Sequence, residues 1–141
     1  MIKVVYDTNV IVSSQLNASG FPAAIVKLAL HGRVRLYISE DLLAEYRDVL
    51  HRSKFGFHPN DVKGLLSLIE RQSKYIQPTE KVDAVTLDPN DNRLLECAVE
   101  GGVDYIVTGN TRHSPFKSFR GIPILTPSEF AKMYLEDLLS E

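Results

Sequence analysis

The chain has 141 residues, of which 44% are apolar and 24% charged, and its formal net charge is −2. This length and composition are typical of a globular protein, and we expect one domain over residues 1–141. The negative charge argues against a general nucleic-acid-binding domain, because such domains are usually basic. A single cysteine, Cys97, excludes an intramolecular disulfide and a cysteine-based zinc site.

No apolar run approaches the ~20 residues needed to cross a membrane. The first residues also lack the basic, apolar and small-residue zones of a secretory signal. We therefore expect a cytoplasmic protein without a membrane partner. Cys97 falls in a helical pattern, so it is expected to be a small core residue in a reducing compartment.

The hydrophobic pattern predicts strands that alternate with helices along the whole chain. The predicted strands cover residues 3–6, 36–38, 75–76, 105–107 and 122–125, and the predicted helices cover 22–31, 39–52, 58–73, 88–101 and 126–139. Such alternation implies an α/β fold with three layers, in which helices cover both faces of a mostly parallel sheet. Pro123 should place the last strand at an edge of this sheet, because proline cannot donate to a strand ladder.

An acid follows the first predicted strand directly, in the sequence VVYDTN that contains Asp7. In open parallel sheets, ligands bind beyond the carboxyl ends of the strands, near a point where the strand order reverses. Asp7 would lie at that edge, which favours a functional role. The alternative is that Asp7 merely caps a helix formed by the residues after it.

Two further acids fall on predicted helices. Glu45 lies at the margin of an apolar stripe, where it can face the site or pair at the surface with a base such as Arg52. Asp91 projects near the middle of another stripe, where a carboxylate is costly unless it is ligated or hydrogen-bonded. It can also reach back to the amide of a helix cap at Asp88, and the two roles are compatible. If these acids gather with Asp7, a divalent metal site is the simplest explanation.

Asn110 follows the predicted strand of residues 105–107 and is either an oxygen ligand or only a turn residue. The residues after it form the one basic and aromatic cluster of note, which comprises Arg112, His113, Lys117 and Arg120 interleaved with Phe116 and Phe119. This cluster can contact a nucleic-acid backbone. The alternative is a solvated loop anchored by its two phenylalanines.

Taken together, these segments resemble the PIN-domain family. Within that family, they resemble the stand-alone toxin components of bacterial and archaeal toxin–antitoxin pairs (VapC-like). The resemblance covers essentially the whole chain and rests on VVYDTNVIVSS, LLAEYRDVL, DPNDNRLLECAVEGG, VDYIVTGN and GIPILTPSEF. It implies a metal-dependent ribonuclease in which Asp7, Glu45 and Asp91 match the three core acids. Asn110 stands where the family often has a fourth Asp, and a neutral ligand there should weaken cation binding without abolishing it.

The same resemblance implies that Mg²⁺ or Mn²⁺ activates a water for attack on an RNA phosphodiester bond. The ligands would be Asp7, Glu45, Asp91 and Asn110. By analogy, Thr8, Asn9 and Thr108 would either support the ligands or contact the substrate phosphate. The other substrate contacts would be Arg112, His113, Lys117 and Arg120. A homodimer and a cognate antitoxin are the implied protein partners. The apolar faces of the helices at 22–31 and 61–73 are candidates for the dimer surface.

Two other functions are compatible with these residues. A catalytically weak PIN-like module that binds RNA or a protein without cleavage would explain both Asn110 and the acidic net charge. A phosphatase of the HAD type would also place an acid after the first strand. That class has a D-x-D-x-T/V signature, and Asn9 replaces its second Asp here, which ranks the phosphatase last.

Overall fold

A computed structural model of the chain describes residues 1–82, 91–109 and 118–139, except for the side chain of Asp91. The strands are β1 (Lys3–Tyr6), β2 (Arg35–Ile38), β3 (Lys74–Tyr75), β4 (Tyr105–Val107), β5 (Ser118–Phe119) and β6 (Ile122–Leu125). They form one sheet in the order β3-β2-β1-β4-β6-β5. All neighbouring strands are parallel except β5 and β6, so the prediction of a mostly parallel sheet is confirmed.

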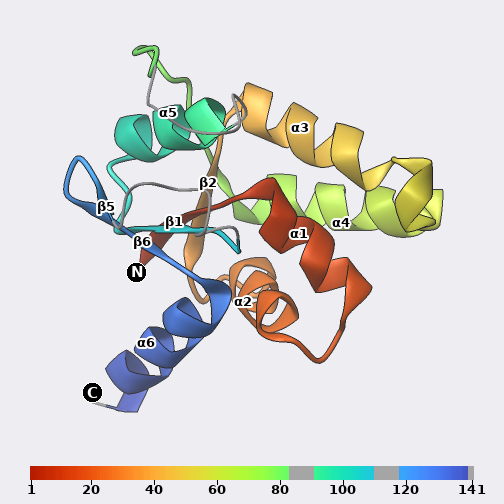
Figure 1. The fold of residues 1–141 in the computed structure, drawn as a ribbon, viewed down its shortest axis with the longest axis horizontal. Helices are drawn as coiled ribbons and strands as arrows, with labels where there is room; N and C mark the ends of the chain where they lie inside the picture. Colours follow the sequence, from red (N-terminus) through yellow and green to blue (C-terminus); the bar gives the residue numbers. More distant parts are fainter. Residues whose placement is uncertain (83–90, 110–117, 140–141) are drawn as a thin grey trace.

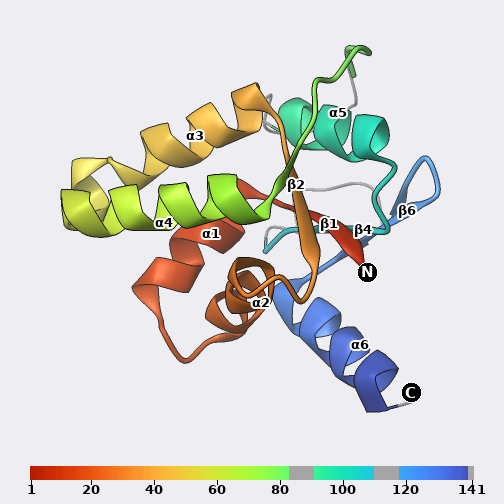
Figure 2. The ribbon, with the colours of Figure 1, turned by 180° about the vertical axis from the view of Figure 1, so that it is seen from behind.

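Helices cover both faces of this sheet. They are α1 (Thr8–Leu16), α2 (Phe21–Leu30), α3 (Glu40–Leu50), α4 (Pro59–Gln72), α5 (Asp91–Gly101) and α6 (Pro127–Leu139), with a short 3₁₀ turn at Ser53–Phe55. Figures 1 and 2 show α3 and α5 on one side of the sheet and α2 and α6 on the other. The predicted α/β architecture is therefore confirmed.

Local sequence signals account for several helix starts. Ser39 caps α3, because its hydroxyl accepts a hydrogen bond from the amide three residues later at 3.1 Å. His58 caps α4 through its ring nitrogen, and Pro59 opens that helix. Thr126 and Glu129 exchange the two hydrogen bonds of a capping box before α6, at 2.9 and 3.1 Å.

The predicted edge position of the last strand is wrong. Strand β6 lies between β4 and β5, and β5 forms the outer edge. The two strands are joined by Arg120 and Gly121, whose φ angles of 49° and 81° suit a tight hairpin turn. Pro123 is tolerated because the pairing of β6 with β4 begins one residue later, at Ile124.

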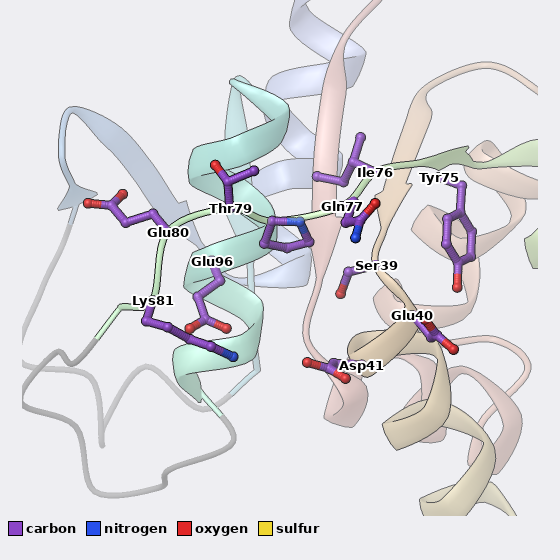
Figure 3. A pocket seen from close by; sticks show the side chains of 11 residues that line it. Ser39, Glu40, Asp41, Tyr75, Ile76, Gln77, Thr79, Glu80, Lys81 and Glu96 are labelled. Carbon is purple, nitrogen blue, oxygen red and sulfur yellow. The ribbon is translucent and has the colours of Figure 1, made fainter.

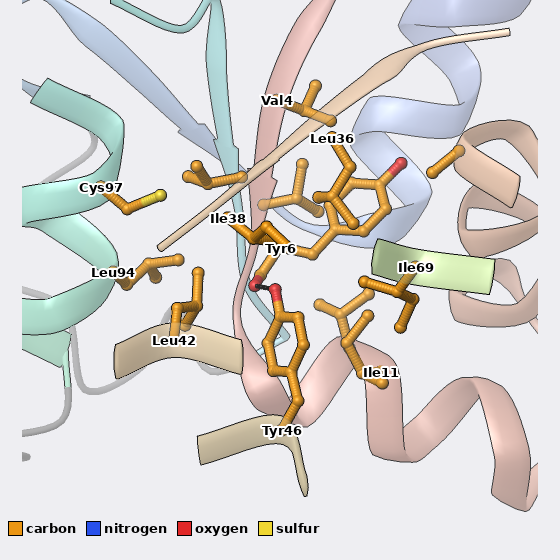
Figure 4. Packing of buried hydrophobic residues seen from close by; sticks show 14 of the residues in the cluster. Val4, Tyr6, Ile11, Leu36, Ile38, Leu42, Tyr46, Ile69, Leu94 and Cys97 are labelled. Atoms are coloured by element: carbon orange, nitrogen blue, oxygen red, sulfur yellow. Dashed lines mark hydrogen bonds between the residues drawn. The ribbon is translucent and has the colours of Figure 1, made fainter. Parts of the chain in front are cut away.

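The core lies between the sheet and its helices (Figure 4). Cys97 is fully buried there, as predicted, and burial raises the pKa of its thiol to about 12. The apolar faces of α2 and α4 also enter this core, through Ala23, Ile25, Val26, Ala29, Val62, Leu65, Leu66 and Ile69. These faces were the candidates for a dimer surface, and the chain instead buries most of them internally. Within the described ranges, no helix is long and apolar enough to cross a membrane.

Candidate active site

The strand order reverses between β1 and β4, at the centre of the sheet. The chain continues from β1 to β2 and β3 on one side, and from β4 to β6 on the other. Asp7 follows β1, and Thr108 follows β4, so both residues lie at the carboxyl edge where the order reverses. The amide of Asp7 extends the pairing of these strands by donating to the carbonyl of Val107 at 2.9 Å. This is the place where open α/β sheets bind their ligands.

Asp7 occupies the N-cap position of α1, but its side chain makes no capping hydrogen bond. Its Oδ2 instead accepts hydrogen bonds from the Thr108 hydroxyl at 2.7 Å and from the Asn9 amide nitrogen at 3.2 Å. Asp7 therefore stands at the cap position of α1, as the capping alternative supposes, but its carboxylate does not cap the helix. The carboxylate is held across the switch point, between the start of α1 and the end of β4.

Glu45 is half-buried on α3 and also reaches this edge. Its Oε2 accepts a hydrogen bond from the hydroxyl of Thr8, the first residue of α1. The predicted surface alternative for Glu45 was an ion pair with Arg52. Arg52 pairs with Asp48 instead, at 3.6 Å. Thr8, the residue after Asp7, thus links Glu45 to the strand end that carries Asp7.

A buried hydrogen bond joins the two elements that carry these acids. Tyr46 follows Glu45, Tyr6 precedes Asp7, and the Tyr46 hydroxyl donates to the Tyr6 carbonyl (Figure 4). Both tyrosines are fully buried. Burial is the largest cause that raises the pKa of Tyr46, and the charges of Asp7 and Glu45 add to the rise. The hydroxyl therefore remains a neutral donor at physiological pH.

Asn9 links the first turn of α1 to the loop after β4. Its amide nitrogen lies 3.5 Å from the hydroxyl of Thr108, and its amide oxygen accepts a hydrogen bond from the amide of Gly109 at 3.1 Å. Thr8, Asn9 and Thr108 were predicted either to support the metal ligands or to contact the substrate phosphate. The structure shows that each of them donates to an acid, so their first role is to orient Asp7 and Glu45.

Several predicted site residues lie outside the described set. They are the side chain of Asp91 and the whole of Asn110, Arg112, His113 and Lys117. Asp91 is the first residue of α5, which contacts β1, β2 and α3. A helix that returns to a parallel strand starts at the carboxyl edge, so the backbone of Asp91 begins on the side of Asp7. Among the described side chains, no three His, Cys, Asp or Glu residues lie close enough together to hold a metal ion.

Arg120 is not brought to the acids. It precedes β6, which runs parallel to β4, so it lies at the opposite edge of the sheet from Thr108. Its guanidinium lies 2.5 Å from a carboxylate oxygen of Glu80 and 5.3 Å from the ring centre of Phe119. The predicted contact between Arg120 and the substrate is therefore not supported. The sequence pattern groups Arg120 with the basic cluster, but Arg120 lies in the hairpin turn between β5 and β6, at the edge of the sheet opposite the acids.

Sequence reasoning missed the role of one residue of this site. The sequence pattern assigned no role to Tyr46, although its hydroxyl fixes α3 against β1. A tyrosine directly after a candidate ligand is a weak signal by itself. It becomes informative because a buried hydroxyl needs a partner.

Two cavities open near the carboxyl edge. One, of about 310 Å³, is lined by Asn9, Val10, Ser13, Pro22, Gly109 and Pro127. The other, of about 480 Å³, is lined by Ser39, Glu40, Asp41, Tyr75, Ile76, Gln77, Pro78, Thr79, Glu80, Lys81 and Glu96 (Figure 3). The larger cavity has a polar lining that does not include Asp7 or Glu45. The smaller one shares Asn9 with the acid site.

The chain is similar to known proteins over most of its length. The family described as PIN domain matches residues 3–112. The protein MJ1680 of Methanocaldococcus jannaschii is 30% identical to this chain over 112 residues, which cover 77% of this chain and 71% of that protein. That relative is described as uncharacterized, so its name specifies no activity.

Proposed function

This chain belongs to the PIN domain family, whose members are generally nucleases, and we propose that it is an endoribonuclease that depends on Mg²⁺ or Mn²⁺. The observation that carries the proposal is the position of Asp7 and Glu45 at the switch point. Each of these carboxylates accepts a hydrogen bond from a threonine hydroxyl. Oriented oxygen ligands at the place where a substrate binds are what a metal-dependent nuclease requires.

The chemistry of the described donors suits a hard divalent cation. The groups described as donating to Asp7 and Glu45 are two hydroxyls and one amide, which orient the carboxylates without adding positive charge. Oxygen ligands of this kind favour Mg²⁺ and Mn²⁺. Asp7, Glu45 and Asp91, with Asn110, would hold one or two ions. When bound, such an ion lowers the pKa of a water and shields the charge of the scissile phosphate.

The chain's own residues contribute preorganisation. Thr108 and Asn9 fix the carboxylate of Asp7, and Thr8 fixes that of Glu45. The hydrogen bond between Tyr46 and Tyr6 keeps α3 in place against β1. The acids therefore need little rearrangement when the substrate arrives, which lowers the barrier to reaction.

The proposed reaction is an in-line hydrolysis of RNA. Water oxygen bonds to phosphorus, the bond from phosphorus to the 3′ oxygen breaks, and the leaving oxygen takes a proton. The products are a 5′-phosphate and a 3′-hydroxyl. Arg112, His113 and Lys117, which lie outside the described residues, are proposed contacts to the RNA backbone.

We further propose that the protein is the toxin component of a toxin–antitoxin pair. The resemblance of the whole chain to stand-alone toxins of this family supports the proposal. A cognate antitoxin and a second copy of the chain are the proposed protein partners. Expression of the wild type should then arrest growth of a bacterial host, whereas Asp7→Asn should not. Equal growth with both proteins would contradict the toxin role without contradicting the nuclease.

Cleavage assays with Mn²⁺ test the nuclease. Asp7→Asn and Glu45→Gln should abolish RNA cleavage, and their thermal unfolding should remain cooperative. Asp48→Asn is the matched control, because Asp48 is an acid on the same helix whose side chain is 77% exposed. This control should cleave like the wild type. Undiminished cleavage by Asp7→Asn, purified free of host nuclease, would overturn the assignment.

A non-catalytic module is the second candidate, and Asn110 is the feature that favours it. A neutral residue at this position removes one charge from the proposed ligand set. Calorimetric titration with Mn²⁺ separates the two functions. Binding by the wild type that is lost in Asp91→Asn supports the metal site and the ligand role of Asp91. No binding at millimolar concentration would favour the module.

A further inference from the structure

The smaller cavity lies directly beside the candidate active site. α1 and α2 are in contact, and so are α2 and α6; Figure 1 shows the start of α6 close to α2. The volume of about 310 Å³ is at the lower end of the range of about 300–1,000 Å³ that is usual for ligand pockets. A cavity of this size suits one ring system rather than an extended ligand.

Asn9 connects this cavity to the candidate active site. It lines the cavity, and its amide nitrogen donates to Oδ2 of Asp7 at 3.2 Å. Gly109, whose amide donates to Asn9 at 3.1 Å, lines the cavity as well. A group in the cavity is therefore one side chain away from the carboxylate of Asp7. An RNA strand with its phosphate at Asp7 would bring an adjacent nucleotide to the mouth of this cavity.

The lining combines apolar walls with a few polar groups. Val10, Pro22 and Pro127 provide the apolar surfaces. Asn9 and Ser13 provide polar side chains from successive turns of α1. A nucleobase has the matching character, because its faces are apolar and its edge carries hydrogen-bonding groups.

Ser13 is the polar group best suited to meet a ligand. The residue is half-buried, and its hydroxyl makes no hydrogen bond within the part of the chain that the structure describes. The hydroxyl of the next residue, Ser14, is by contrast tied to the carbonyl of Ile11 at 2.5 Å. Ser13 can therefore donate to and accept from a base edge without breaking a contact in the protein.

We propose that this cavity is a subsite for the nucleobase next to the scissile phosphate, and that the Ser13 hydroxyl hydrogen-bonds the edge of that base. The subsite rests on the proposed ribonuclease function. It adds a cavity in which the enzyme would contact a base of the RNA, in addition to its contacts with phosphate. Ser13 is a binding residue in this scheme and takes no part in the chemistry.

Binding of a fluorescein-labelled single-stranded RNA octamer tests the subsite, with Asp7→Asn as the background so that the RNA stays intact. Ser13→Leu fills the cavity and should weaken binding about tenfold, as expected when one base contact is lost. Ser67→Leu is the matched control, because Ser67 is exposed on α4 and lines neither cavity. Ser13→Ala removes only the hydroxyl, keeps the test available if the leucine variant misfolds, and should weaken binding by about two- to tenfold.

Octamers that lack one base at each position in turn locate the contact. In the protein that keeps Ser13, removing the base at one position should lower the affinity as much as Ser13→Leu does. Combining that octamer with the Ser13→Leu protein should lower the affinity no further. Equal affinity of the Ser13→Leu and Ser67→Leu proteins would overturn the subsite, as would losses that add at every position.

Two further measurements separate this proposal from the nuclease itself. Mn²⁺ titration of Ser13→Leu should match that of the wild type, because the variant leaves the acids in place. Metal-dependent cleavage by the wild type, together with Ser13→Leu binding that equals the control, would overturn the subsite and leave the nuclease standing. If the wild type neither binds nor cleaves RNA, the proposed function fails and the subsite fails with it.

Discussion

Replacing Tyr46 by phenylalanine removes one hydroxyl from the junction between β1 and α3. That hydroxyl donates to the carbonyl of Tyr6, and both side chains are fully buried. The carbonyl would then lose a donor in a place that water does not reach, which typically costs about 1–3 kcal/mol. For a chain of this size, such a loss lowers Tm by about 3–9 °C.

Thermal and urea unfolding of Tyr46→Phe measure this cost. Tyr105→Phe is the matched control, because the Tyr105 ring packs against Phe130 while its hydroxyl makes no hydrogen bond among the described residues. The control should change the free energy of unfolding by less than about 0.5 kcal/mol. Mn²⁺ affinity should fall in Tyr46→Phe only, since the lost bond positions the elements that carry Asp7 and Glu45. Equal stability of the two variants would refute the reasoning.

Two other predictions concern the packing and titration of the fold. A Cβ on Gly101 would lie 2.5 Å from the ring of Tyr37, whereas one on Gly64 would meet no atom within 4 Å. Gly101→Ala should therefore lower the free energy of unfolding in urea by about 1–3 kcal/mol. Gly64→Ala should raise it by about 0.5–1 kcal/mol, because alanine favours the helix. A rise at both positions would contradict the close approach of Tyr37 to Gly101. The pKa of Cys97 is raised by burial from 9.0 to about 12, so the unfolded state loses its proton first and stability falls as pH rises above 9. Between pH 9 and 10 the wild type should lose stability faster than Cys97→Ala, and parallel profiles would contradict the assignment.

Signals between near neighbours in the sequence were sufficient for much of the fold. The helix predicted from residue 126 begins where Thr126 and Glu129 form a capping box, and the Thr126 amide is the largest cause that lowers the pKa of Glu129. The helix predicted from residue 39 likewise begins at a local cap, the hydroxyl of Ser39. These predictions succeeded because a cap and its amide partner lie within one turn of each other.

The hydrophobic pattern did not predict two elements, α1 and β5. Helix α1 contains the β-branched run Val10, Ile11 and Val12, which favours a strand by local preference, and these residues are buried together in the core. Strand β5 has only two residues, which is too short for a periodic signal. In α1 the packing of distant elements overrides the local preference, whereas β5 forms by hairpin pairing with its neighbour β6.

By itself, the sequence determined the alternation of strands and helices and the placement of Asp7 at the end of a buried strand. Only the tertiary structure decided which groups hold the acids. Thr8 meets Glu45 across 37 positions, and Thr108 meets Asp7 across 101 positions. It also decided that Arg120, close in sequence to the basic cluster, lies at the other edge of the sheet. Periodicity fixes the face on which a side chain lies, but its partner depends on strand order and helix packing, which form only when the whole core assembles.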